Sequence, residues 1–201
     1  MTPRSPGAGF AIVLGAITLI TPLTVHLFLP AMPDVKSDFA TSDALVQLAF
    51  SISLLAMAVV TPVYGTLSDR YGRRPVLLAG LLLFLAGSLM SAMAPNLMVL
   101  IAGRLIQAIG AGCGLTLSRA IARDAYGPEA LVKAIAYLTM AYTLGPMIAP
   151  AFGGFLIDSF GWRSAFWFAL VSGIAITAAA YRVLYETHGT NDTAGGKSRL
   201  S

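Results

Sequence analysis

The chain has very few charged residues for its length. Of its 201 residues, 11% are Asp, Glu, Lys or Arg, whereas 57% are hydrophobic. Soluble domains carry about 25% charged residues. So few charges cannot cover a water-exposed surface. The composition therefore excludes an ordinary soluble domain and indicates a protein that is integral to a lipid membrane.

Cysteine and histidine are also scarce. The single cysteine, Cys113, lies inside an apolar run and has no partner for an intrachain disulfide. There are two histidines, and one of them, His188, lies in the polar C-terminal segment. The chain also lacks the phosphate-binding motif G-x-x-x-x-G-K-[ST]. We therefore expect no enzyme activity, no metal, no cofactor and no ATP-driven pumping; an integral membrane enzyme is the weakest alternative.

Six apolar runs are each long enough to cross a membrane. They cover roughly residues 9–29, 46–64, 76–93, 97–118, 134–157 and 165–185. A length of about 18–24 residues matches a hydrocarbon core roughly 30 Å thick, and the lack of water there requires helical backbone. The connections are then 30–45, 65–75, 94–96, 119–133 and 158–164. We predict an all-α bundle of six transmembrane helices at 1–185 and a polar cytoplasmic tail at 186–201.

The pattern of one connecting segment recurs later in the chain. Residues 65–74, Gly-Thr-Leu-Ser-Asp-Arg-Tyr-Gly-Arg-Arg, align without a gap with residues 154–163, Gly-Phe-Leu-Ile-Asp-Ser-Phe-Gly-Trp-Arg. The first copy joins spans two and three, and the second joins spans five and six. An offset of three spans places the copies on opposite membrane faces. The pattern therefore predicts two inverted three-helix repeats, as in secondary transporters.

The basic residues gather on one predicted side of the membrane. The side of the 65–75 connection carries Arg4, Arg70, Arg73, Arg74, Arg119, Arg123, Lys133, Arg182, Lys197 and Arg199. The opposite side carries only Lys36 and Arg163. Because Lys and Arg in short loops stay in the cytoplasm, both termini are predicted to be cytoplasmic. The net charge of +4 thus reflects topology and does not indicate a nucleic-acid partner.

Several motifs resemble those of one transporter family. The segment Gly65-x-Leu-x-Asp69-Arg70-x-Gly72-Arg73-Arg74-Pro75 resembles the signature between spans two and three of the major facilitator superfamily. The motifs beginning at Arg104 and Gly145 resemble its fourth-span and antiporter motifs. Leu29-Pro-Ala-Met-Pro33 and Arg119-Ala-Ile-Ala-Arg-Asp124 resemble the Bcr/CflA branch of drug:proton antiporters. The resemblance implies the amino-terminal half of a twelve-span transporter in a bacterial-type inner membrane.

The connection between spans two and three is the first candidate site. We expect Gly65 and Gly72 to allow a tight turn. Asp69 lies close enough in sequence to neutralise one of the nearby arginines, and also to interact with the N-terminus of the next helix. By resemblance, Gly65, Asp69, Arg70, Gly72, Arg73 and Arg74 form a conformational latch between two bundles. The plainer alternative is a topology anchor. We also expect Arg119, Arg123 and Asp124 to pair with this connection.

Two helical motifs contribute further candidates. Arg104 lies eight residues inside the fourth span, about 12 Å deep, where an arginine needs a cavity or a partner. Gln107 is on the same face. By resemblance Arg104 takes part in proton coupling, and the alternative is a structural arginine capping carbonyls of the first span. In the fifth span Gly145, Pro146, Pro150, Gly153 and Gly154 match the antiporter motif, with glycines that favour close helix contact. We expect the same packing from Gly110, Gly112 and Gly114.

His26 departs from the family pattern. It lies on one face of the first span with Gly15, Thr18 and Pro22, a polar stripe typical of a helix that lines an interior. The related transporters usually have an aspartate at this position. A histidine can still exchange protons, because its ordinary pKa is about 6.5. The two open interpretations are a proton carrier and a packed neutral histidine.

The sequence predicts a secondary transporter that exports small amphipathic compounds or drugs, with the proton gradient as its energy source. Because family members bind substrate between two six-span bundles, the chain is interpreted as a truncated product, an incomplete sequence, or a half that pairs with another half or with itself. The alternative function is a non-transporting membrane protein that binds or assembles with partners.

Overall fold

Long helices fill nearly all of the chain that the computed structural model describes, residues 7–187, and that part contains no strand. The helices are α1 (Ala8–His26), α2 (Met32–Asp38), α3 (Asp43–Tyr71), α4 (Arg73–Ala92), α5 (Leu97–Ala111), α6 (Cys113–Ala125), α7 (Pro128–Phe160) and α8 (Arg163–Val183). With α5 and α6 taken together, six helical segments within residues 7–187 are long and apolar enough to cross a membrane. The predicted number of spans is thus confirmed. Residues 188–201 of the predicted tail lie outside the described residues.

Three spans are longer than the sequence predicted. The second extends from Asp43 to Tyr71, the fourth reaches Ala125, and the fifth runs from Pro128 to Phe160. The predicted loop at 65–75 is therefore wrong, because only Gly72 separates α3 from α4. The physical reason is that hydropathy detects contact with lipid. A helix satisfies its own backbone hydrogen bonds and continues beyond the hydrocarbon core with charged side chains in water.

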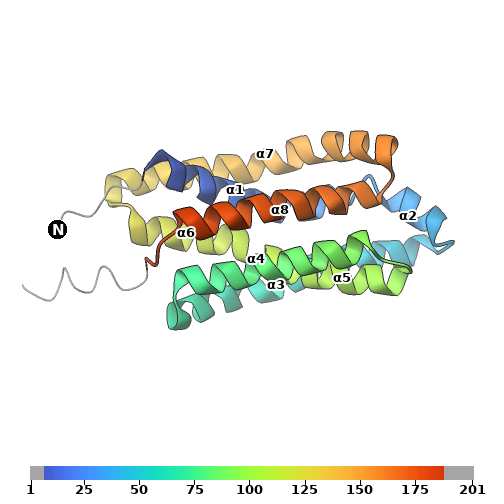
Figure 1. Cartoon of the computed structure of the whole chain (residues 1–201), viewed down its shortest axis with the longest axis horizontal. Coiled ribbons are helices and arrows are strands. Elements are labelled where there is room, and N and C mark those ends of the chain that lie inside the picture. The colour runs from blue at the N-terminus through green and yellow to red at the C-terminus, as the bar shows by residue number, and fades with distance from the viewer. Residues whose placement is uncertain (1–6, 188–201) are drawn as a thin grey trace, which may run out of the picture.

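The two glycine turns confirm the inverted repeat. Gly72 ends α3 with φ 97° and Gly161 ends α7 with φ 77°, a backbone region that favours glycine. In Figure 1 the α3–α4 turn lies at one end of the bundle and the α7–α8 turn at the other. We call these the Gly72 end and the Gly161 end. Helix α2 lies at the Gly161 end, and both α1 and α8 have their chain-terminal ends at the Gly72 end.

Glycines bring the backbones of α4 and α5 into direct contact. A Cβ atom at Gly87 would lie 2.2 Å from the Gln107 backbone nitrogen, and one at Gly110 would lie 2.2 Å from that of Phe84. Such contact is a common way for membrane helices to associate, because it increases van der Waals packing where lipid offers no hydrophobic driving force. The expectation for Gly110 is confirmed. It also holds for Gly112, which faces Val60, and Gly114, which faces the first span.

Candidate functional site

Arg73 is the centre of the charged cluster at the Gly72 end. Its guanidinium group contacts Asp69 of α3 at 2.5 Å and Asp124 of α6 at 2.9 Å, and it donates a hydrogen bond to Ser68. The side chain is 6% exposed. We call Asp69, Arg73 and Asp124 the Arg73 cluster. The predicted neutralisation of one arginine by Asp69 and the predicted pairing of Asp124 with this region are both confirmed.

Other residues of the predicted latch lie outside this cluster. Gly65 lies within α3 and not at a turn, so its expected role in the turn is wrong. The guanidinium of Arg70 lies 5.3 Å from the ring of its neighbour Tyr71. Arg74 donates to the carbonyl of Tyr181 at the end of α8 and lies over its ring. Of Gly65 and Gly72, which the sequence predicted to form a tight turn, only Gly72 has the positive φ of a turn.

Glu186 fills the position that we had expected Asp69 to occupy at the N-terminus of α4. Its carboxylate accepts hydrogen bonds from the backbone N–H groups of Arg73 at 3.0 Å and Arg74 at 3.2 Å. The first N–H groups of a helix have no partner within the helix and favour an anion. Glu186, assigned from sequence to the tail, thus contacts the bundle, and Thr187 beside it is buried. No local signal indicates this contact, which spans 113 residues.

Arg104 is buried inside the bundle, with 1% of its surface exposed. Its Nη1 donates to the carbonyl of Thr24 at 2.7 Å and to Oε1 of Gln107 at 2.9 Å, and its guanidinium lies 4.5 Å from the ring of Phe28. Because α1 ends at His26, the Thr24 carbonyl has no partner further along that helix. The geometry is that of an arginine that caps the first span, which is the structural alternative named above.

Gln107 extends this arrangement to a third helix. Its Nε2 donates to Oγ of Ser88 on α4 at 2.9 Å, so hydrogen bonds link α1, α5 and α4 across the bundle. Among the described residues, Nε and Nη2 of Arg104 have no hydrogen-bond partner. A cavity of about 10 Å³ is lined in part by Arg104. That volume is close to the minimum needed for one water molecule.

The stripe on the first span packs largely against the fifth. A Cβ atom at Gly15 would lie 2.7 Å from the Tyr137 ring, and Pro22 lies opposite Gly145. Thr18 is buried and its hydroxyl donates to a carbonyl of its own helix. His26 is partly exposed at the end of α1. Among the described residues, none forms a hydrogen bond or an ion pair with its side chain.

The motif of the fifth span forms part of the α1–α7 interface. A Cβ atom at Gly145 would lie 2.5 Å from Cγ of Pro22, and one at Gly153 would lie 3.2 Å from Leu27. No atom lies within 4 Å of the corresponding point at Gly154, so its expected packing role is wrong. Helix α7 continues through Pro146 and Pro150 without a break.

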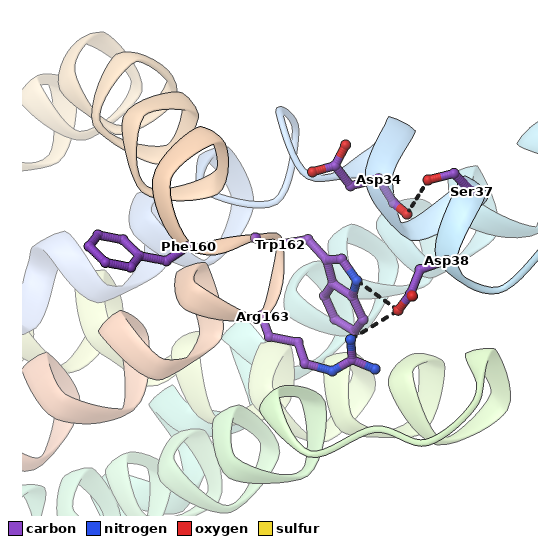
Figure 2. A pocket seen from close by; sticks show the side chains of 7 residues that line it. Asp34, Ser37, Asp38, Phe160, Trp162 and Arg163 are labelled. Atoms are coloured by element: carbon purple, nitrogen blue, oxygen red, sulfur yellow. Dashed lines mark hydrogen bonds and ion pairs between the residues drawn. The ribbon is translucent and has the colours of Figure 1, made fainter.

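A second polar cluster lies at the Gly161 end, where sequence reasoning placed no functional residue. Asp38, the last residue of α2, accepts hydrogen bonds from the indole N–H of Trp162 at 3.0 Å and from Arg163 at 2.9 Å (Figure 2). These hydrogen bonds from Trp162 and Arg163 lower the pKa of Asp38 below its ordinary value. An open pocket of about 390 Å³ lies between α2 and the α7–α8 turn. The recurrence of Gly-x-Arg at 161–163 was the available signal.

Comparison with known proteins identifies the family. The family model of the Major Facilitator Superfamily matches residues 14–200. The multidrug resistance protein MdtL of Shigella dysenteriae serotype 1 is 32% identical over 190 residues, which cover 94% of this chain and 49% of the relative. The chain thus spans about half the length of the curated relatives that it matches.

Two solved structures share the fold. One is the human organic anion transporter MFSD10 (TETRAN), with a TM-score of 0.71 and 23% identity over 89% of this chain and 48% of that one. The other is the proton:xylose symporter XylE, with a TM-score of 0.79 and 16% identity over 89% of this chain and 45% of that one. With the match to the family model over nearly its whole length, the chain belongs to the Major Facilitator Superfamily.

Proposed function

We propose that this chain works as one six-helix half of a secondary transporter that exports small amphipathic compounds in exchange for protons. The observation that carries the proposal is the 32% identity to a multidrug resistance protein over 94% of the chain. The motif of the fifth span, which is associated with antiporters, supports proton exchange. The proton gradient supplies the energy, and no cofactor is needed.

Substrate binding in this proposal requires a second bundle. Sites for small molecules usually have volumes of about 300–1,000 Å³. The cavity beside Arg104 has about 10 Å³, which is too little for any substrate. A second six-span half, or a second copy of the chain, supplies the opposite wall of a substrate site.

The Arg73 cluster serves as the latch in this proposal. A pocket of about 400 Å³ lies beside it, lined by Asp69, Arg73, Arg123 and other residues of α3, α6 and α7. The second bundle covers this pocket when that end of the transporter is closed. Arg73 is then held by Asp69 and Asp124 of its own bundle in every state. The surface around the pocket is free to separate from the second bundle.

Arg104 and His26 have different roles in the proposal. Arg104 organises the polar network of α1, α5 and α4, because it joins the Thr24 carbonyl to Gln107. His26 is the ionisable group at the end of the same helix, two residues beyond Thr24. The end of α1 therefore holds both His26 and the carbonyl that Arg104 binds, so protonation of His26 can act on the position of α1.

The proposed membrane is a bacterial-type inner membrane, with the Gly72 end in the cytoplasm. The excess of Lys and Arg near that end supports this orientation. The protein contacts the lipid bilayer through part of its exposed apolar surface.

The test is an efflux assay in cells that lack their own drug exporters. The chain is coexpressed with the carboxy-terminal half of the multidrug resistance relative, and efflux of the amphipathic cation ethidium is followed with and without a proton uncoupler. We expect uncoupler-sensitive efflux with both halves, and loss of it in Arg104→Ala with membrane insertion unchanged. Normal efflux by Arg104→Ala leaves that residue with a structural role alone.

A non-transporting binding or assembly protein is the second candidate. The absence of a substrate-sized cavity beside Arg104 favours it. If both halves insert and associate, but ethidium efflux stays at background with every second half supplied, this candidate replaces the first.

A further inference from the structure

The arginines of the two repeats make reciprocal contacts. Arg74, the second residue of the third span, belongs to the first repeat and donates to the carbonyl of Tyr181 at the end of α8, at 2.8 Å. Arg163, its counterpart in the second repeat, donates to the carbonyl of Ala94, just beyond the end of α4, at 3.2 Å. Each arginine therefore caps the C-terminal end of the other repeat's third span, where unpaired carbonyls favour a cation.

The carboxylates likewise pair with residues of the opposite repeat. Asp124 belongs to the second repeat and holds Arg73 of the first. Asp38 belongs to the first repeat and holds Trp162 and Arg163 of the second. Asp38 follows the first span of its own repeat, and Asp124 lies at the end of the first span of its own. The Arg73 cluster thus has a counterpart at the opposite end of the bundle, which we call the Asp38 cluster: Asp38, Trp162 and Arg163.

We propose that the Asp38 cluster is a second clamp, which holds α2 and the first repeat against the second repeat at the Gly161 end. With the Arg73 cluster at the other end, it joins the two repeats at both ends of the described bundle. The inference does not depend on transport, since it concerns contacts within this chain.

The two clamps differ in strength. In the Arg73–Asp124 pair the side chains are 6% and 19% exposed, whereas in the Arg163–Asp38 pair they are 41% and 45% exposed. An exposed ion pair stabilises a fold far less than the loss of one partner destabilises a buried pair. The ion pair at the Gly161 end is therefore the weaker of the two contacts between the repeats.

Trp162 is the anchor of the Asp38 cluster. Its side chain is 4% exposed and packs edge-to-face against Phe39, next to α2, and against Phe166 of α8. The guanidinium of Arg163 lies 4.1 Å from the indole ring. Figure 2 shows the indole and the guanidinium both directed at Asp38, while the carboxylate of Asp34 on the same helix points away from them.

The test measures distances at both ends in the full chain in lipid nanodiscs. Spin labels at Ser37→Cys and Ser159→Cys report the Gly161 end, and labels at Thr66→Cys and Arg123→Cys report the Gly72 end; Cys113 is fully buried and stays unlabelled. In Asp38→Asn and Arg163→Gln we expect loss of the single narrow distance distribution at the Gly161 end alone. The matched control Asp34→Asn keeps both distributions narrow.

Two further variants keep the proposal testable if these proteins fold poorly. Trp162→Phe removes only the N–H donor and should broaden the same distribution. The exchange Asp38→Arg with Arg163→Asp restores the ion pair but removes the acceptor of the Trp162 N–H, so the distribution should be narrower than in Asp38→Asn and broader than in the unmodified chain. The clamp is rejected if the Gly161-end distribution stays narrow in Asp38→Asn, Arg163→Gln and Trp162→Phe, if Asp34→Asn broadens it equally, or if both ends broaden together.

Discussion

At the scale of single residues, burial decides which ion pairs stabilise this bundle. Arg73 is almost fully enclosed and has three polar partners from α3 and α6, whereas Lys36 and Asp43 form a pair whose side chains are 44% and 82% exposed. A buried cation cannot regain water when it loses a partner. The two pairs should therefore respond very differently to the same chemical change.

The first prediction compares those two pairs. Asp124→Asn removes the charge opposite Arg73 and should lower the free energy of unfolding by about 3 kcal/mol, the low end for breaking a buried pair because Asp69 remains. The control, Asp43→Asn, should change it by about 0–1 kcal/mol. Thermal unfolding in detergent measures both. Equal losses in the two variants contradict the assignment of Arg73 as the central cation.

The second prediction concerns His26 and uses the two-half efflux assay. An unperturbed histidine titrates near 6.5 and an aspartate near 3.9. If His26 carries the proton, His26→Asp should shift the pH dependence of efflux to lower pH. In His26→Gln, which keeps hydrogen bonding but cannot titrate, efflux should no longer depend on the proton gradient. Unchanged pH profiles in both variants return His26 to a packing role.

At the scale of helices, the fit between α1 and α7 depends on one absent side chain. Pro22 has a rigid ring, and that ring occupies the space where a Cβ at Gly145 would lie. Neither partner can move without displacing its helix. The antiporter motif is therefore, in physical terms, a close contact between two spans.

The third prediction tests that contact with two alanines. Gly145→Ala should destabilise the bundle by about 1–3 kcal/mol, because the new methyl group overlaps the Pro22 ring. Gly154→Ala, in the same helix with open space around it, should be neutral or stabilising by up to about 1 kcal/mol, since alanine favours helix more than glycine. Detergent-solubilised variants are compared by thermal unfolding. Identical effects contradict the packing argument.

The sequence predicts the number of spans and the turn at Gly72 because both leave local patterns. An apolar run of membrane length marks each span, and Gly72 and Gly161 occupy equivalent positions in a repeated segment. Helix ends are harder. Tyr71 and Phe160 lie beyond the predicted spans, because polar residues at a helix end lower hydropathy without ending backbone hydrogen bonding.

Within the candidate site, sequence reasoning finds cations more readily than their partners. Arg73 and Arg104 are conspicuous as charges in or beside apolar spans. Their partners include a backbone carbonyl at Thr24 and a carboxylate at Asp124. A carbonyl is present at every residue, so no side-chain pattern identifies the one that is used. The Asp124 pairing was predictable only because the fourth span places it at the same membrane face.

At the scale of the whole molecule, the uneven placement of basic residues predicts one direction for all six spans. The chain-terminal ends of α1 and α8 lie at the same end as the Gly72 turn (Figure 1). An even number of crossings requires this arrangement. One experimental measurement at each end therefore determines the orientation of every span.

The fourth prediction follows from that direction. Reporter enzymes fused after Ser201 and inserted in residues 65–75 should show cytoplasmic activity, whereas a reporter within 34–43 should show activity outside. Paired alkaline phosphatase and β-galactosidase fusions make the measurement. A periplasmic signal after Ser201 contradicts either the number of crossings or the proposed orientation.

The contact of Glu186 with the start of α4 has a consequence for biosynthesis. The N–H groups of Arg73 and Arg74 are made early, yet their carboxylate partner leaves the ribosome more than one hundred residues later. Until then the turn at Gly72 lacks its anion. The second and third spans therefore enter the membrane with an unfinished junction, and arrival of the sixth span completes it. The order of synthesis thus makes Glu186 a marker that all six spans are in place.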